Sequence, residues 1–83
     1  MCYVYVIQNE KKQFYIGYTT NLHNRLAAHN AGENASTRGH KWHLVYFEAY
    51  VSERYALERE QSLKKNRRMK TILLNRVRES LSF

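Results

Sequence analysis

The sequence predicts an α/β (α+β) fold, in which helices flank a three-stranded antiparallel sheet in the order β-β-α-β-α-α. Two observations lead to this prediction: segments rich in Val, Ile and Tyr alternate in side-chain pattern, and amphipathic segments follow residues that cap helices. With 83 residues, 43% of them apolar, and no proline, the chain has room for one modest core. We therefore expect a single domain over residues 1–83.

The strands are predicted from alternation. Large side chains alternate at 3–8 and at 14–19, and the polar residues 9–13 between them predict an antiparallel hairpin. A third strand is expected at 44–50, after a polar loop at 33–43.

The helices are predicted from their caps. Thr20 or Asn21 can cap a first helix that runs to about residue 31, where Gly32 ends it. Ser52 can cap a second helix that reaches about residue 65. A third helix is expected at 70–81, with arginines 76 and 78 outward; its expected inward residues are Ile72, Leu73, Val77 and Leu81.

Charge is the most informative part of the composition. Fourteen Lys and Arg residues against seven acids give a net charge of +7, and the segment from Lys64 to Phe83 holds seven basic residues and one acid. Such a field favours phosphate backbones, with an affinity that falls steeply with salt; the alternative is simply a solvated surface. The expected nucleic-acid-binding residues are Arg38, Lys41, Lys64, Lys65, Arg67, Arg68 and Lys70.

Cysteine usage and hydropathy narrow the setting. Cys2 is the only cysteine, which excludes an internal disulfide and a thiolate-rich zinc site and fits a reducing compartment. No apolar run approaches the roughly 18 residues that a membrane span needs. We therefore expect a cytoplasmic protein without a membrane partner.

All seven acids are glutamates, and aspartate is absent. Nucleases that hold two metal ions usually need several converging carboxylates. A nuclease of this composition is therefore expected to use one metal ion and very few carboxylate ligands.

Glu60 departs from the amphipathic pattern of the second helix. Helical spacing places it in the middle of the expected inward stripe, and a buried carboxylate is costly without a counter-ion or a metal. The alternative is a glutamate that pairs with a core arginine or reaches out at the helix edge. The other members of the stripe are Ala56, Leu57, Leu63 and Lys64.

Arg25 and His29 are four residues apart on the first helix and therefore share a face. A guanidinium can clamp two phosphate oxygens, and a histidine one turn away can orient water or transfer a proton. The alternative is that both side chains lie on a solvated face.

Seven tyrosines are an unusual number for this length, and most are expected in the core. Tyr5 and Tyr15 lie on neighbouring predicted strands, where their hydroxyls can converge. A free phenol has a pKa of about 10, but beside an arginine and a metal it can lose its proton and act as a general base.

The segments Tyr3-Val4-Tyr5 and, ten residues later, Tyr15-Ile16-Gly17 resemble the two motifs of the GIY-YIG nuclease superfamily. The likeness is greatest to its small stand-alone bacterial members, which are also similar to the N-terminal nuclease domain of the excinuclease C subunit. It continues in order over nearly the whole chain, through residues 21–30, 36–39, 44–46 and 56–60.

This resemblance implies a three-stranded antiparallel sheet flanked by helices and cleavage of phosphodiesters with one divalent metal, Mg²⁺ or Mn²⁺, leaving 3′-hydroxyl and 5′-phosphate ends. It implies that Glu60 is the sole protein ligand of the metal and that Tyr5 is the general base. Tyr15 would contact water or phosphate, Arg25 would hold the scissile phosphate, and His29 would assist with water or proton transfer.

The sequence departs from the family pattern at two residues of the first motif. Tyr3 and Val4 replace the first Gly and the Ile of the family name, and the larger Tyr3 narrows the approach of a nucleic-acid backbone. Many family members also have an Asn after the metal-binding Glu; Asn66 and Asn75 are both available for this place, and the sequence does not choose between them. Lys64, one turn beyond Glu60, either faces the site or neutralises that carboxylate.

We therefore expect a metal-dependent endonuclease that acts on DNA, in repair or recombination. The alternative is a nucleic-acid-binding module that keeps the fold and cuts little or not at all. A small RNA-associated protein is a third interpretation, based on charge alone. Since the chain carries no separate recognition domain, a protein partner that supplies target specificity is part of the expectation.

Overall fold

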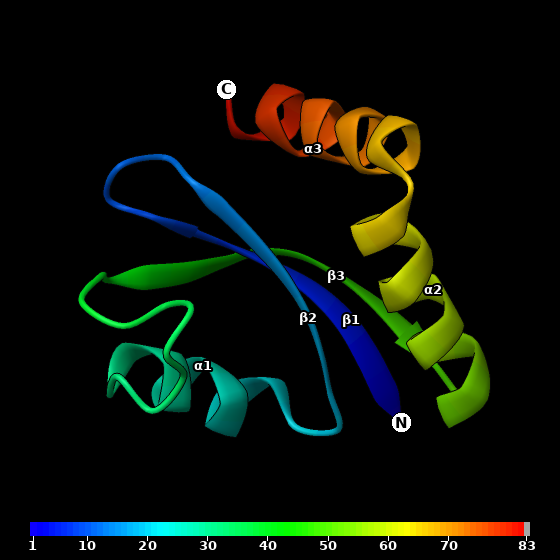
Figure 1. The fold of residues 1–83 in the computed structure, drawn as a ribbon, viewed down its shortest axis with the longest axis horizontal. Helices are drawn as coiled ribbons and strands as arrows, with labels where there is room; N and C mark the ends of the chain where they lie inside the picture. The colour runs from blue at the N-terminus through cyan, green and yellow to red at the C-terminus, as the bar shows by residue number, and fades with distance from the viewer. Residues whose placement is uncertain (83) are drawn as a thin grey trace.

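The computed structural model describes residues 1–82, and it confirms the predicted fold and order of elements (Figure 1). The elements are β1 (Cys2–Asn9), β2 (Phe14–Thr19), α1 (Leu22–Asn30), β3 (Trp42–Tyr50), α2 (Glu53–Lys65) and α3 (Arg67–Leu81).

The sheet has the order β2-β1-β3, so the N-terminal strand is its centre. Both pairings are antiparallel, and Tyr5 lies opposite Gly17 on one side and Phe47 on the other. The register with β3 shifts between Val6 and Ile7. Because directly opposite residues of antiparallel strands project to the same face, Tyr5 and its two partners share one face of the sheet.

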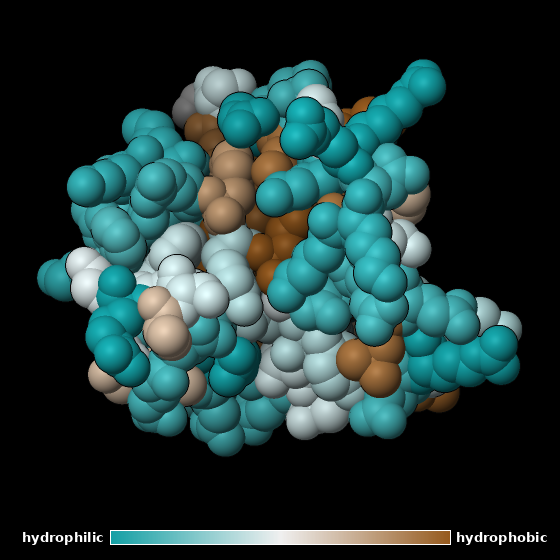
Figure 2. Space-filling model, in the orientation of Figure 1, coloured by the Kyte–Doolittle hydropathy of each residue, from teal (hydrophilic) through white to brown (hydrophobic). Residues whose placement is uncertain are grey.

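The two faces of the sheet support two separate apolar clusters. Helices α2 and α3 cover one face and α1 covers part of the other (Figure 1). The larger cluster joins Val4 and Val6 of β1 to Ala56, Leu63, Leu73, Leu74 and Val77 of the helices. The smaller one contains Tyr5, Ile7 and Trp42, with Leu22 and Leu26 of α1 packed against it. Figure 2 shows one side of the molecule, on which polar side chains surround a narrow band of apolar atoms.

Helix boundaries follow asparagine caps. Asn21 caps α1, since its side chain accepts a hydrogen bond from the Asn24 N–H, which decides between the two predicted caps. The third helix begins at Arg67 rather than at residue 70, because the Asn66 side chain accepts from the Met69 N–H at 3.1 Å.

The predicted inward residues of the helices are partly wrong. Ile72 and Leu81 are 55% and 46% exposed, whereas Leu74, which the pattern left out, is buried beside Leu73 and Val77. On α2, Leu57 is exposed instead of inward, and the side chain of Lys64 is 47% exposed. Both helices therefore present a narrower apolar stripe to the sheet than the sequence pattern predicts.

Among residues 1–82, no helix is long and apolar enough to cross a membrane.

Candidate active site

Tyr5 is at the centre of the candidate site. It is 2% exposed, on the central strand, and its ring lies over the neighbouring Gly17 of β2. A Cβ atom at Gly17 would lie 2.3 Å from the Tyr5 hydroxyl oxygen. Only the absence of a side chain at Gly17 allows the Tyr5 hydroxyl to lie there.

Helix α1 brings Arg25 and His29 to the Tyr5 hydroxyl. The Arg25 Nε–H donates to the hydroxyl oxygen at 3.3 Å, and His29 Nε2 lies 2.7 Å from the same oxygen. His29 is 1% exposed, so the interpretation of this pair as a solvated face is wrong for the histidine. The four-residue spacing on α1 thus places a guanidinium and an imidazole on one phenol.

Tyr15 lies on β2 beside these groups. Its ring meets the His29 ring edge-on at a centroid distance of 5.1 Å and the Trp42 ring at 6.3 Å. The Lys64 ammonium lies 5.3 Å from the centre of the Tyr15 ring. Tyr15 is therefore packed between the α1 side of the site and a cation from α2.

Glu60 lies on α2, and its charge acts on the Tyr5 hydroxyl. Its side chain is 18% exposed, and its carboxylate is 3.2 Å from the Lys64 ammonium. Both sequence interpretations of Lys64 are therefore correct, because it neutralises Glu60 and also contacts the site residue Tyr15. The structure brings Tyr5, Tyr15, Arg25 and His29 into contact. Glu60 is linked to this group through Lys64, which lies against the Tyr15 ring, and through the effect of its charge on Tyr5.

The electrostatics favour a neutral Tyr5 and a neutral His29. Burial raises the pKa of the Tyr5 hydroxyl, and the charge of Glu60 raises it further, whereas Arg25 partly offsets this change. Burial, together with the charge of Arg25, lowers the pKa of His29. Tyr5 as it stands is therefore not the acidic phenol that a general base requires, and a second cation or a proton acceptor has to assist it.

The residues fit a single hard cation and not a protein-built cage. Within residues 1–82 no three His, Cys, Asp or Glu side chains gather closely enough to hold a metal ion. Glu60 alone offers carboxylate oxygens, the donor type that magnesium prefers, and Lys64 already places a positive charge on them. One carboxylate completed by water and substrate phosphate matches the habit of Mg²⁺ of keeping much of its hydration shell.

The two asparagines that sequence analysis considered for the site are engaged elsewhere. The Asn66 side chain caps α3, and the Asn75 side chain accepts a hydrogen bond from Arg78. Neither one supports Glu60.

Sequence reasoning missed a buried threonine. Thr37 lies in the predicted polar loop, but it is fully buried, and its hydroxyl is 2.7 Å from His29 Nδ1. The only signal for it was its place in the Ser36–Gly39 segment that resembles the family.

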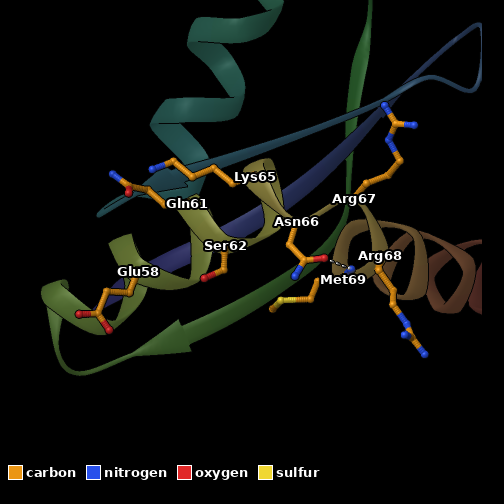
Figure 3. A pocket seen from close by; sticks show the side chains of 8 residues that line it. All are labelled: Glu58, Gln61, Ser62, Lys65, Asn66, Arg67, Arg68 and Met69. Carbon is orange, nitrogen blue, oxygen red and sulfur yellow. Dashed lines mark hydrogen bonds between the residues drawn. The ribbon is translucent and has the colours of Figure 1, made fainter.

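All seven predicted nucleic-acid-binding residues are exposed. Three of them, Lys65, Arg67 and Arg68, line an open groove of about 840 Å³ where α2 meets α3 (Figure 3). The groove lies on a different face of α2 from Glu60, because its α2 residues are Glu58, Gln61, Ser62 and Lys65. This groove is lined by none of the residues around Tyr5, so it is a candidate phosphate-docking surface and not the Tyr5 site itself.

A buried tyrosine that contacts arginine and histidine on a small antiparallel sheet, with a glutamate beside it, defines the class as a GIY-YIG-type catalytic fold. The family described as the GIY-YIG catalytic domain matches residues 1–72, and the chain belongs to this family.

Relatives resemble this chain over most of their length. A UPF0213 protein of Haloquadratum walsbyi is 41% identical over 70 residues, which are 82% of this chain and 79% of the relative. One of Clostridium perfringens is 38% identical over 84 residues, covering 95% and 90% of the two chains. The solution NMR structure of a UPF0213 protein from Bacillus halodurans is 34% identical, with a TM-score of 0.56, over 90% of this chain and 84% of that one.

Proposed function

We propose that the protein is a divalent-metal-dependent endonuclease that hydrolyses phosphodiester bonds of DNA and leaves 3′-hydroxyl and 5′-phosphate ends. The observation that carries this proposal is the Tyr5 hydroxyl, which lies 2.7 Å from His29 Nε2 and 3.3 Å from Arg25 Nε. A phenol held between a proton acceptor and a fixed cation is arranged for proton transfer rather than for packing alone.

Tyr5 is the general base of the proposed reaction. It passes its own proton to His29 and accepts one from the water that attacks phosphorus. Burial and Arg25 lower the pKa of His29 and so keep Nε2 unprotonated in the resting site. The same shift makes the imidazole a weaker base, so the transfer depends on the charge of Arg25 to stabilise the ionised Tyr5. Tyr15, which packs on His29, orients the water or the phosphate.

Arg25 holds the scissile phosphate in this scheme. Its Nε–H is used by Tyr5, and the rest of its guanidinium can donate to phosphate oxygens. Its charge also favours the ionised form of Tyr5, and it stabilises the negative charge that develops on the phosphate.

Glu60 is the proposed protein ligand of one Mg²⁺ or Mn²⁺ ion. When bound, the ion supplies charge neutralisation at the phosphate and at the leaving 3′ oxygen. Lys64, now 3.2 Å from the Glu60 carboxylate, has to move toward the substrate to free it.

The substrate is proposed to lie over Tyr5 and to extend along the basic groove at the α2–α3 junction. Lys65, Arg67 and Arg68 line this groove (Figure 3). In the proposed complex they contact phosphates, which does not read the base sequence. Because these proposed contacts are all with the phosphate backbone of the nucleic acid, a protein partner is proposed to select the target. DNA repair or recombination in the cytoplasm is the proposed setting.

One observation favours a binding module that does not cut. Burial raises the pKa of Tyr5, and the only described cation beside Glu60 is the amine of Lys64. If Lys64 keeps Glu60 from binding metal, the same basic surface binds nucleic acid without hydrolysis.

The test is cleavage of labelled branched, nicked and plain duplexes with Mg²⁺ or Mn²⁺, with a chelator as the blank. Glu60→Gln and Tyr5→Phe are compared with Glu79→Gln, a matched change at an exposed carboxylate on α3, away from the groove and from the Tyr5 site. Binding is measured on the same samples in parallel, and circular dichroism checks that each variant is folded.

Loss of cleavage in Glu60→Gln and Tyr5→Phe, with binding retained and Glu79→Gln active, supports the nuclease. No cleavage by the unmodified protein on any duplex with either metal rejects it in favour of the binding module.

A further inference from the structure

Thr37 is held in place from three directions. Its backbone N–H donates to the Asn34 carbonyl at 3.1 Å, and its own carbonyl accepts from the Trp42 indole N–H at 2.8 Å. Its hydroxyl lies 2.7 Å from His29 Nδ1. The Thr37 side chain has no exposed surface although most of its loop lies at the surface, and its hydroxyl points to His29.

The hydrogen-bond directions around His29 follow from counting donors. Arg25 donates to the Tyr5 oxygen, so the Tyr5 O–H needs an acceptor. Within the described residues, His29 Nε2 is the acceptor within hydrogen-bond distance of that hydroxyl. A neutral imidazole that accepts at Nε2 carries its hydrogen on Nδ1, and this N–H donates to the Thr37 hydroxyl.

The Thr37 hydroxyl can accept from His29 because its own hydrogen has another acceptor. The Asn34 carbonyl oxygen lies 3.4 Å from Thr37 Oγ1, a long hydrogen bond that leaves the threonine lone pairs free for the imidazole. The network therefore runs from Arg25 through Tyr5, His29 and Thr37 to a backbone carbonyl. In the reverse tautomer, two donors would face the Tyr5 oxygen and its own hydrogen would lack a partner.

We infer that Thr37 is a positioning residue that keeps His29 protonated at Nδ1, so that Nε2 is free to take the proton of Tyr5. The role in cleavage rests on the proposed function, whereas the tautomer does not. In the step, the Tyr5 O–H bond breaks and its proton joins His29 Nε2. The resulting imidazolium still donates from Nδ1 to Thr37, and the Tyr5 oxygen takes a proton from the attacking water.

The experiment compares Thr37→Val, which keeps the shape and removes the hydroxyl, with Thr37→Ser, which keeps the hydroxyl. Two-bond ¹H–¹⁵N NMR correlations of the His29 imidazole report which nitrogen carries the hydrogen. Kinetics on the cleaved duplex separate kcat from KM.

The unmodified protein and Thr37→Ser are expected to show the Nδ1–H tautomer, and Thr37→Val a shift toward Nε2–H. In Thr37→Val we expect kcat to fall by roughly 10-fold or more with KM unchanged, by analogy with the loss of hydrogen-bond partners that fix the tautomer of metal-bound histidines. Thr37→Ser should restore most of the rate.

An unchanged His29 tautomer in Thr37→Val overturns the inference, even if cleavage is lost. If Thr37→Val does not fold, an Nε2–H tautomer in the unmodified protein overturns it equally. If the unmodified protein cuts no duplex, a tautomer shift in Thr37→Val still supports the positioning of His29, and only the proposed function fails.

Discussion

The Tyr5 hydroxyl occupies the space that a side chain at Gly17 would need. A Cβ atom there would lie 2.3 Å from the hydroxyl oxygen and 2.4 Å from the ring carbon that bears it. The phenol is therefore in contact with the backbone of the neighbouring strand and cannot share that position with any other side chain.

Gly17→Ala is expected to displace the Tyr5 ring and so to break its contacts with Arg25 and His29. We expect cleavage to be lost and the unfolding free energy to fall by about 1–3 kcal/mol, as in other overpacked sites. Chemical denaturation of a double-mutant cycle with Tyr5→Ala measures this: the alanine at 17 should cost much less once the ring is absent.

The control for this prediction is Gly39→Ala. No atom lies within 4 Å of a Cβ at Gly39, but its φ of +88° disfavours other residues. Gly39→Ala should lose stability through backbone strain and keep its cleavage rate. Equal losses of activity in both variants would contradict the steric explanation.

Glu48 is the best-satisfied carboxylate on the opposite side of the sheet. Arg59 donates to both of its oxygens at 2.9 Å, and the hydroxyls of Tyr46 and Tyr50 donate at 2.6 and 2.7 Å. Although burial opposes it, these hydrogen bonds lower the pKa of Glu48 to about 2. Glu48→Gln is expected to cost about 2 kcal/mol at neutral pH and to leave cleavage unchanged.

The pH dependence of this cost has a definite sign. The carboxylate of Glu48 is held ionised in the folded state, so its stabilisation is complete above pH 4.5 and is lost as the pH falls toward about 2. The unfolding free energies of the unmodified protein and of Glu48→Gln, measured with urea between pH 7 and pH 2, should therefore converge at the acid end. Glu58→Gln, which breaks an exposed pair with Arg54, should show almost no difference at any pH.

Because of His29, we predict that both stability and cleavage fall at acid pH. Because burial and Arg25 lower its pKa below the usual 6.5, the neutral form contributes fully above pH 6.5. That contribution is lost as the pH falls through the folded-state pKa. Cleavage should fall over the same interval, since an imidazolium cannot accept the Tyr5 proton. NMR titration of His29 and rates from pH 5 to 8 measure both, and His23→Gln, an exposed change on the same helix, should not alter the rate profile.

The groove at the α2–α3 junction predicts a salt-dependent affinity. Removing the charges of Arg67 and Arg68 together should weaken DNA binding and reduce the slope of log K against log salt by about 1 for each lost phosphate contact. The matched control is the double neutralisation of Lys11 and Lys12 at the β1–β2 turn, which changes net charge equally. If the two double variants weaken DNA binding equally, the affinity depends on net charge and not on the groove.

Sequence patterns were sufficient for the elements because each carried its own local signal. Strand alternation, the Asn21 and Ser52 caps and the turn between the first two strands depend on nearby residues only. The family motifs likewise marked Tyr5, Tyr15, Arg25 and His29, which are in contact in the structure. They also marked Glu60, which pairs with Lys64.

What the sequence could not supply depends on contacts between distant elements. Thr37 looked like an ordinary loop residue because its burial comes from a histidine eight residues earlier. The orientation of α3 buries Leu74 and leaves Ile72 exposed, and this depends on how the helix crosses the sheet and not on its own period. The raised pKa of Tyr5 is also a consequence of burial, which composition does not reveal.

Trp42 is the only tryptophan of the chain, and it is packed against the loop that positions His29. Its ring is 5% exposed and meets Tyr15 and His40 edge-on. With excitation at wavelengths that tyrosine does not absorb, the intrinsic fluorescence therefore comes from this one indole, although the chain also has seven tyrosines. The emission wavelength and the quenching of Trp42 can therefore report, without any added label, whether the Thr37 loop stays packed against the indole.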